Sequence, residues 1–297
     1  MEVIIDENFT GVRADSALLA YCENSEEVKL NRSQIKKLID SGQIKLNDQI
    51  LTKAGTKLKA GDKLEIHLPD SEPFRFNPEI IYEDENVIVF NKPSGMLTHA
   101  KGGLVQEQTL SSLLQPSTTN LDEQRTGIVH RLDRDTSGVI ITAKNPEAKT
   151  LLMRQFSDRK AKKTYLAVVE GELKLKEANL DWPIGRNPKI PSLFRVAPEG
   201  KPSFTHYQVL AENKKLSLVE LHPKTGRTHQ LRVHMAHLGH PIVGDRFYNP
   251  DSKAERLMLH ALSLEITIPG GIRKTFTASP PEDFQNFIKL NGLEARQ

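Results

Sequence analysis

The chain has 297 residues, enough for one large domain with a small one or for two domains. Hydrophobic residues make up 37% and charged residues 27%, an ordinary balance for a soluble globular protein, and no apolar run approaches the roughly 18 residues of a membrane span. The acidic N-terminus lacks the basic and apolar regions of a secretory signal. Cys22 is the single cysteine, which excludes an internal disulfide and a cysteine-rich metal cluster. We therefore expect a protein of the reducing cytoplasm.

Positive charge is clustered along the chain rather than spread evenly. The net charge is only +3, but residues 29–63 hold nine Lys or Arg against three Asp or Glu. Residues 154–163 hold five basic side chains against Asp158. Clustered positive charge is typical of nucleic-acid binding, although a solvated basic face without a function has the same pattern.

The first 68 residues predict a small unit of two helices followed by short strands. A strand is expected near residues 3–5 and a helix over 13–20. A second helix begins near Ser33, a good N-cap residue, and ends at Gly42. Residues 64–68 then alternate apolar and polar side chains, which predicts a strand.

A proline-rich segment separates this unit from the rest of the chain. Residues 69–78 contain three prolines and predict a linker. We place the linker at residues 71–79, between a first domain at residues 1–70 and a second at residues 80–297.

The second domain mixes strands and helices without regular β-α-β alternation, which predicts an α+β fold on a mixed, mainly antiparallel sheet. One segment, rich in Pro, Gly and Asn, predicts a long excursion over residues 180–202. The other predicted elements are strands at 80–90, 128–129, 139–143, 164–169, 203–210, 216–221 and 259–268, and helices at 110–114, from Pro146, at 227–238 and at 280–290.

Five of the ten histidines fall within residues 222–240, which raises the question of a metal site. His229 and His234 are five residues apart, no H-E-x-x-H pattern is present and no cysteine is near, so we predict no metal. The segment Lys224-Thr-Gly226 lacks the preceding glycines of a phosphate loop, so we predict no nucleotide cofactor. A metal-dependent hydrolase remains a rival that a chelator would inhibit.

The densest chemistry lies in Gly127–Gly138, between two apolar runs. Asp133 is flanked there by Arg131 and Arg134, and the predicted helix that contains Arg232 offers another guanidinium. A lone carboxylate can attack an electron-poor sugar carbon or remove a proton if it stays ionised in a water-poor pocket, and a bidentate arginine would lower its pKa. A solvated turn whose charges satisfy one another is the alternative.

Five short motifs are spread over this domain. One of them, His130-Arg-Leu-Asp-x-x-Thr-Ser-Gly138, resembles the catalytic motif of the RluA family of RNA pseudouridine synthases. The other four motifs follow the family order along the chain: Asn91–Gly95 with His99, Lys163–Tyr165, Thr225–His234 with Gly239–Asp245, and Leu259–Ala261.

The resemblance implies a role for each matching residue. Asp133 is the catalytic aspartate, Arg232 its ion-pair partner, and Tyr165 stacks on the target base and is a candidate for proton handling at C5. Arg131 fills the gap left by a flipped-out uridine, and Leu259 forms part of the apolar floor. Flipping is required because C1′ and C5 cannot be reached in a stacked helix. The remaining substrate-binding candidates are His130, Asn91 and Lys92.

Three segments of the first domain form a recurring pattern: Arg13-x-Asp15, the helix–Gly–strand–Asn pattern of Asn31–Asn47, and Ala60-Gly-Asp62. Together they resemble the S4 RNA-binding domain. Such a domain contacts phosphates, which supplies affinity and register rather than sequence choice. The resemblance implies that three side chains face RNA phosphates: Arg32, Lys36 and Lys37.

Together these patterns predict an isomerase that converts specific uridines of RNA into pseudouridine without a cofactor or metal. Large-subunit ribosomal RNA is the expected substrate, and transfer RNA is the alternative. Asp133 either attacks C1′ or abstracts the 2′ proton. A non-catalytic RNA-binding or assembly factor is the competing class. No pattern predicts more than a monomer.

Overall fold

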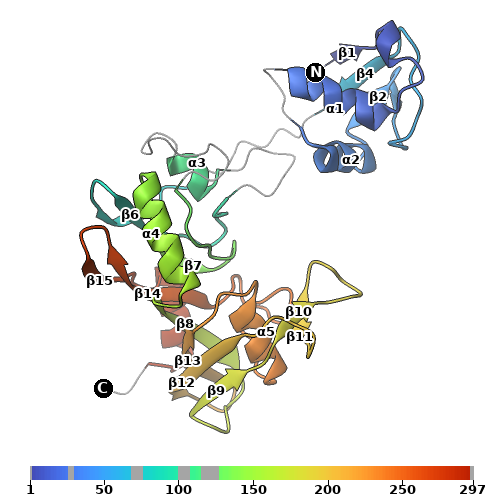
Figure 1. Cartoon of the computed structure of the whole chain (residues 1–297). Helices are drawn as coiled ribbons and strands as arrows, with labels where there is room; N and C mark the ends of the chain where they lie inside the picture. Colours follow the sequence, from blue (N-terminus) through green and yellow to red (C-terminus); the bar gives the residue numbers. More distant parts are fainter. Residues whose placement is uncertain (1, 26–29, 68–75, 100–107, 115–126, 295–297) are drawn as a thin grey trace. The chain divides into compact units, whose positions relative to one another are not determined.

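The computed structural model describes most of the chain as two compact units, one formed mainly by residues before Phe76 and one by Phe76–His99 and Thr109–Gln297 (Figure 1). Among the described residues, no helix is both long and apolar enough to cross a membrane. The described ranges are 2–25, 30–67, 76–99, 108–114 and 127–294.

The first unit packs two helices against a four-stranded sheet with the order β1-β4-β2-β3. Its core consists of aliphatic side chains from both helices and the sheet, among them the fully buried Leu18, Ile35 and Leu64. Its elements are β1 (Glu2–Ile4), the 3₁₀ turn η1 (Glu7–Phe9), α1 (Ala14–Asn24), α2 (Arg32–Asp40), β2 (Ile44–Leu46), β3 (Gln49–Ile50) and β4 (Lys63–Ile66).

Helix α2 begins two residues earlier than we predicted. The N-cap is Asn31, whose side chain accepts hydrogen bonds from the backbone N–H groups of Ser33 and Gln34. The Gln34 side chain accepts in return from the backbone N–H of Asn31 at 2.7 Å. This capping box satisfies donors that the first turn leaves unpaired, so the prediction that Ser33 is the cap was wrong.

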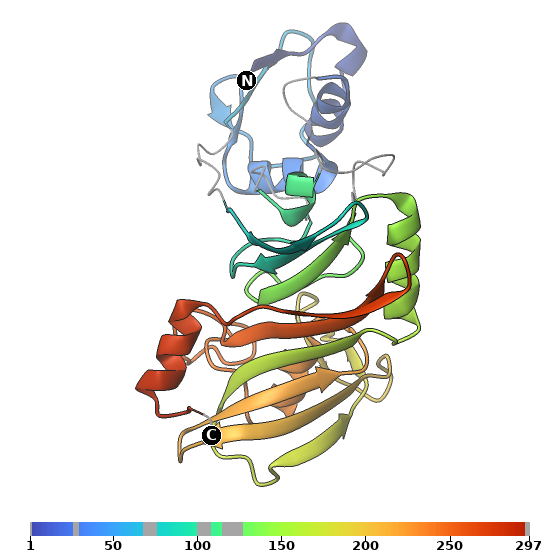
Figure 2. The ribbon, with the colours of Figure 1, turned by 90° about the vertical axis from the view of Figure 1, so that its left-hand side faces the viewer.

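The second unit is built on a nine-stranded sheet with the order β5-β6-β7-β14-β8-β13-β12-β9, with β15 paired to β14. Among the described strands only β7 and β14 pair in parallel, which confirms a mainly antiparallel sheet (Figure 2). The strands are β5 (Glu79–Glu83), β6 (Val87–Lys92), β7 (Ser137–Ala143), β8 (Lys162–Glu170), β9 (Glu177–Asp181), β12 (Phe204–Glu212), β13 (Leu216–Pro223), β14 (Leu259–Ile268) and β15 (Ile272–Thr277).

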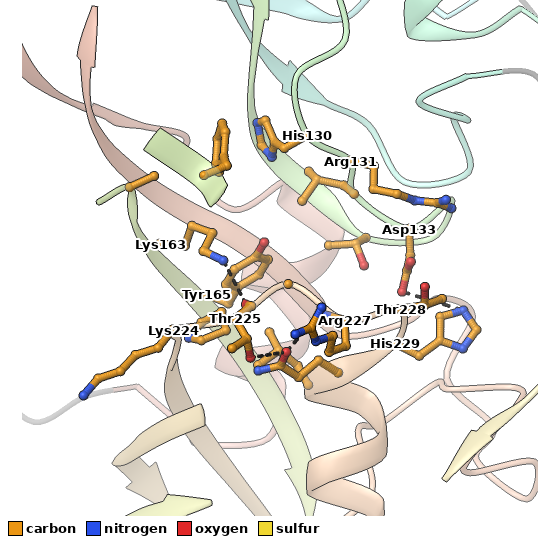
Figure 3. A pocket seen from close by; sticks show the side chains of 18 of the residues that line it. His130, Arg131, Asp133, Lys163, Tyr165, Lys224, Thr225, Arg227, Thr228 and His229 are labelled. Atoms are coloured by element: carbon orange, nitrogen blue, oxygen red, sulfur yellow. Dashed lines mark hydrogen bonds and ion pairs between the residues drawn. The ribbon is translucent and has the colours of Figure 1, made fainter. Parts of the chain in front are cut away.

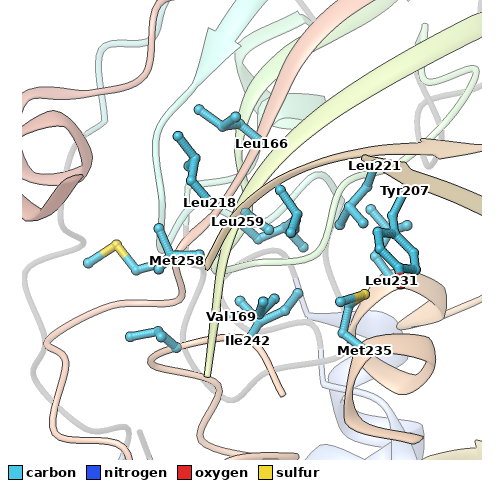
Figure 4. Packing of buried hydrophobic residues seen from close by; sticks show 14 of the residues in the cluster. Leu166, Val169, Tyr207, Leu218, Leu221, Leu231, Met235, Ile242, Met258 and Leu259 are labelled. Carbon is cyan, nitrogen blue, oxygen red and sulfur yellow. The ribbon is translucent and has the colours of Figure 1, made fainter. Parts of the chain in front are cut away.

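The helices of this unit are α3 (Leu110–Leu114), α4 (Pro146–Ser157), α5 (Gln230–His237) and α6 (Glu282–Leu290). One core cluster joins α5 to strands β8, β12 and β13 (Figure 4). Leu231 and Met235 on α5 are buried there with Leu259 at the start of β14. Each such side chain stabilises the fold by roughly 1.5–3 kcal/mol, so the core holds α5 against the sheet.

Three predicted elements differ in the structure. The helix expected from Arg227 begins only at Gln230, after His229 in the left-handed conformation at φ 56°. The expected strand at Ile128 makes a single bridge to Thr142. The excursion over residues 180–202 is more ordered than predicted, because β10 (Ile184–Arg186) and β11 (Phe194–Val196) form a separate two-stranded sheet.

Gly138 allows the parallel pairing that places the Asp133 loop. Its φ is +113°, and a Cβ there would lie 2.2 Å from the backbone oxygen of Ala261 on β14. Any side chain would therefore push β7 away from β14. The close approach of these strands brings the Asp133 loop to the start of β14, next to Leu259.

Candidate active site

The Asp133 loop opens onto a cavity of about 500 Å³ within the second unit. Its walls come from that loop, the end of α4, strand β8, residues 223–229 and the first turn of α5 (Figure 3). Six of the predicted site residues line it, although they lie up to 129 positions apart in the sequence: His130, Arg131, Asp133, Tyr165, Arg232 and Leu259.

Asp133 is a partly exposed carboxylate that faces a guanidinium and an imidazole. Its side chain is 19% exposed. Its Oδ2 lies 3.4 Å from Nη1 of Arg232 and 3.9 Å from Nε2 of His229. The contact with the Arg232 guanidinium holds this carboxylate at the wall of the cavity.

The strongest ion pair at the site is between Arg232 and Asp245 rather than Asp133. Nε and Nη2 of Arg232 each donate to Asp245 at 2.7 Å, and the two side chains are only 3% and 0% exposed. Burial acts to lower the pKa of Arg232, but the hydrogen bonds and charge of Asp245 outweigh it, and the pKa is raised. Arg232 therefore binds Asp245 through Nε and Nη2, and its Nη1 donates to Asp133.

Asp245 is in turn held by the backbone that follows it. Its Oδ1 accepts the N–H groups of Phe247 and Tyr248 at 3.0 and 3.1 Å. The rings of these two residues each lie 5.3 Å from the Arg232 guanidinium. Asp245 belongs to a motif of the sequence, but its role is not visible there, because its partner Arg232 is 13 residues away along the chain.

His229 is a second residue that sequence reasoning did not place at the site. Its Nδ1 lies 2.9 Å from the Tyr248 hydroxyl, and its ring stacks near Phe247 at a centroid distance of 5.9 Å. The left-handed backbone at this position is strained for a residue other than glycine. The strain turns the imidazole into the cavity toward Asp133 before α5 begins.

Tyr165 lies on β8 between Leu221 of β13 and Ala261 of β14. Burial, followed by the negative charge of Asp133, raises the pKa of its phenol well above the usual value. The hydroxyl therefore stays protonated, and the ring presents a flat surface in the cavity. That surface is suited to stacking on a base.

Lys163 lies two residues before Tyr165 on the same face of β8 and also lines the cavity. Its Nζ donates to the backbone oxygen of Thr225 at 3.0 Å, and burial lowers its pKa to about 8. The loop that carries Thr225 is fixed by Gln230, whose Oε1 accepts from the Thr225 hydroxyl at 2.7 Å and from the Arg227 N–H at 3.0 Å.

His130 lines the cavity as a neutral ring. Its Nε2 accepts the backbone N–H of Ile141 at 3.1 Å, and it stacks on Phe156 with centroids 4.4 Å apart. Burial, with a smaller effect from Lys163, lowers its pKa to about 3. The ring therefore offers a neutral surface to the cavity rather than a charge.

Asn91 and Lys92, predicted to bind substrate, do not line the cavity. Lys92 is fully buried and donates to the backbone oxygens of Pro93, Met96 and Arg134 at 2.9, 2.9 and 3.0 Å. Burial, partly opposed by Asp135 and Asp133, lowers its pKa to about 7. Lys92 thus supports the backbone of the Asp133 loop, and Asn91 donates to Glu79 at 3.1 Å.

The predicted phosphate-binding residues of the first unit are exposed on α2. Arg32 is 64% exposed, and its Nη2 lies 3.3 Å from the Ser16 hydroxyl and 3.7 Å from Asp15. Lys36 and Lys37 are also exposed. Their helix thus presents three cations to solvent.

The histidines after β13 have partners within the protein. His234 is fully buried, with Nδ1 3.0 Å from the Thr205 hydroxyl and Nε2 3.0 Å from the backbone oxygen of Trp182. Within the described ranges, no group of three or more His, Cys, Asp or Glu is arranged to hold a metal ion.

Comparison with known proteins matches both units to known families. The RNA pseudouridylate synthase family matches residues 86–237, and the S4 domain family matches residues 27–64. Ribosomal large subunit pseudouridine synthase D of Haemophilus influenzae is 35% identical over 89% of this chain and 87% of its own length. The enzyme of the same name from Escherichia coli K12 is 34% identical over 96% of this chain and 92% of its own length. An uncharacterized RNA pseudouridine synthase of Aquifex aeolicus is 40% identical over 73% and 72%.

Solved structures agree with this result. Human RNA pseudouridylate synthase domain containing 1 is 30% identical over 69% of this chain and 84% of its own, with a TM-score of 0.58. Human RNA pseudouridylate synthase domain containing 4, at 24% identity and a TM-score of 0.60 over 73% and 94%, shares the fold. The motifs, the cavity that gathers them and these matches confirm the resemblance, and the chain belongs to the RNA pseudouridylate synthase family of isomerases, with an S4 domain in its N-terminal part.

Proposed function

We propose that this enzyme converts specific uridines of large-subunit ribosomal RNA into pseudouridine, with Asp133 as the reacting group. The observation that carries the proposal is the carboxylate of Asp133 in a cavity, 3.4 Å from an arginine that is itself anchored by a buried carboxylate. Support for the RNA class comes from the similar enzymes of Haemophilus influenzae and Escherichia coli, which are ribosomal large subunit pseudouridine synthases.

The reaction breaks the C1′–N1 bond and forms a C1′–C5 bond in the same nucleotide. The target uridine leaves the stack and enters the cavity. Asp133 then either attacks C1′, forming an ester bond that C5 later displaces, or removes the 2′ proton and returns it to C2′ when C5 adds to C1′. Both routes release uracil. The uracil turns and rejoins through C5, which loses its proton as N1 gains one. Asp133 is the candidate acceptor of the C5 proton, because the Tyr165 hydroxyl stays protonated, and no oxidant or reductant is needed.

The other cavity residues divide between the base and the backbone of RNA. Tyr165 stacks on the base, and Leu259 forms the apolar floor. Arg131, which is exposed at the rim, takes the space that the flipped uridine leaves. In the S4 unit, the phosphate contacts come from Arg32, Lys36 and Lys37.

The test uses RNA transcribed with uridine that carries tritium at C5. The purified enzyme is expected to release tritium from a large-subunit ribosomal RNA transcript and not from transfer RNA transcripts. Pseudouridine mapping then identifies the converted position. Asp133→Asn should reduce release by about 10⁴-fold while RNA binding stays near the wild-type value, because the amide can neither attack nor accept a proton. Appreciable turnover by Asp133→Asn would refute the role of Asp133. Tritium release from transfer RNA alone would identify transfer RNA, rather than ribosomal RNA, as the substrate.

A further inference from the structure

We propose that Lys163 is the residue that recognises uracil in the cavity, by donating a hydrogen bond to the O4 carbonyl of the flipped uridine. The inference rests on the proposed function and extends it to the choice of base. Its starting point is the order of groups across the cavity. Asp133 lies at one end, Lys163 at the other, and Tyr165 between them (Figure 3).

The ammonium of Lys163 has donors to spare. It carries three N–H groups, and one of them donates to the backbone oxygen of Thr225 at 3.0 Å. No carboxylate contributes to its pKa, which burial alone lowers. Lys163 is half-buried, and a cation that loses part of its hydration without a counter-ion is costly. An acceptor supplied by the substrate would relieve that cost.

Position favours a base carbonyl over a phosphate. Arg131 and Lys224 line the same cavity but are exposed, as expected for groups that meet the RNA backbone. Lys163 instead projects from β8 beside Tyr165, in a wall that also contains Phe156 and Ala161. When C1′ is at Asp133 and the base stacks on Tyr165, the edge of the base farthest from the sugar faces Lys163.

The chemistry of the isomerisation suits one donor at this place. Turning free uracil about its C6–N3 axis brings C5 to the position of N1 and exchanges the two carbonyls. The carbonyl that faces Lys163 is therefore O4 in uridine and O2 in pseudouridine, so the same hydrogen bond serves substrate and product. Cytosine would place an amino donor against the ammonium, and a site built for an acceptor rejects such a base strongly. The cation also stabilises the negative charge that uracil gains when the C1′–N1 bond breaks.

The test combines two variants with one altered base. Lys163→Met removes the donors at similar length, and Lys163→Arg retains a cationic donor. Lys162→Met is the matched control, because this neighbour on β8 is 73% exposed and pairs with Glu265 instead. The substrate is a synthetic RNA hairpin that contains the uridine converted by the wild-type enzyme. A second hairpin carries 4-thiouridine at that position, because sulfur is a weak acceptor.

Single-turnover rates are followed by chromatography of the nucleosides after digestion. We expect Lys163→Met to lower the rate about 100-fold, Lys163→Arg to restore part of it, and Lys162→Met to match the wild type. The sulfur substitution should slow the wild type about tenfold and change Lys163→Met little, because the contact is already lost.

Two outcomes would overturn the inference while the wild-type enzyme remains active. One is a Lys163→Met rate equal to that of the wild type. The other is a 4-thiouridine effect of the same size in Lys163→Met as in the wild type. That result would mean that the Lys163 ammonium contacts a phosphate or another group rather than O4. Absence of conversion by the wild type on every RNA would instead refute the proposed function, so the two failures are distinguishable.

Discussion

Each unit of the molecule contains an arginine that donates to an aspartate through Nε and Nη2, yet the two pairs differ in their exposure to solvent. In the S4 unit, Arg13 reaches Asp15 at 2.9 and 3.0 Å and is 51% exposed. In the catalytic unit, Arg232 reaches Asp245 at 2.7 Å twice and is 3% exposed. Solvent weakens the ion pair between Arg13 and Asp15. The ion pair between Arg232 and Asp245 is shielded from solvent, so removal of one charge would leave the other buried and unpaired.

The difference follows from what each unit does with positive charge. The S4 unit presents Arg32, Lys36 and Lys37 in water, where they can meet phosphates in many orientations. The catalytic unit uses Arg232 to set the position of one carboxylate, Asp133. Under the proposed function, these surface charges supply affinity for RNA, and the buried charge sets the geometry of Asp133.

Removing the buried partner is expected to have the largest effect on stability. Asp245→Asn leaves Arg232 buried without a countercharge, which should lower the free energy of unfolding of the catalytic unit by about 3–5 kcal/mol. Activity should fall with it, because Nη1 no longer holds Asp133. Urea unfolding followed by Trp182 fluorescence measures this unit alone, since Trp182 is the single tryptophan and lies within it.

The matched control is Asp15→Asn in the S4 unit. The Arg13 side chain is 51% exposed although that of Asp15 is only 8% exposed, so water replaces part of the lost pairing. The free energy of unfolding of the S4 unit, followed by hydrogen exchange of its backbone amides, should fall by at most about 1 kcal/mol. A loss of equal size in the two variants would contradict the contrast between the pairs.

The surface cations are expected to affect RNA affinity rather than chemistry. Replacing Arg32, Lys36 and Lys37 by Gln should weaken RNA binding on the order of 10–100-fold at low salt and lower the slope of log affinity against log salt by about 2–3. The single-turnover rate at saturating RNA should remain that of the wild type. Filter binding over a salt series measures the slope, and an unchanged slope would place the RNA contacts elsewhere.

The smallest expected effect is a dependence on pH. Burial lowers the pKa of Lys163 to about 8, so the side chain is a cation below pH 8 and neutral above it. If the cation assists uracil release, kcat/KM should decline roughly two- to tenfold as the pH rises through 8. His130, its titratable neighbour, is already neutral there because its pKa is about 3. Lys163→Arg should remove the decline, and a decline that persists in this variant would assign it to another group.

Much of the fold could be predicted because its signals are local. The alternation and length of the apolar runs matched β14 over Leu259–Ile268 and located α2, α4 and α6 to within two residues. The motif around Asp133 located a loop that lines the cavity, since reactive side chains on a short loop between apolar runs are unusual. The boundaries failed where side chains compete for a cap, as at Asn31 and Ser33, or where a residue adopts a left-handed backbone, as at His229.

The roles of several motif residues were decided only by the tertiary structure. Asp133 and Arg232 are 99 residues apart, and nothing local reveals that Asp245 takes the bidentate contact. Lys92 occurs in a motif like the others, yet three backbone carbonyls hold it away from the cavity. Lys163 differs from Lys162 by one position, but strand alternation turns one into the cavity and the other toward Glu265. Residue type determines what chemistry is possible, whereas burial and long-range pairing determine which residues perform it.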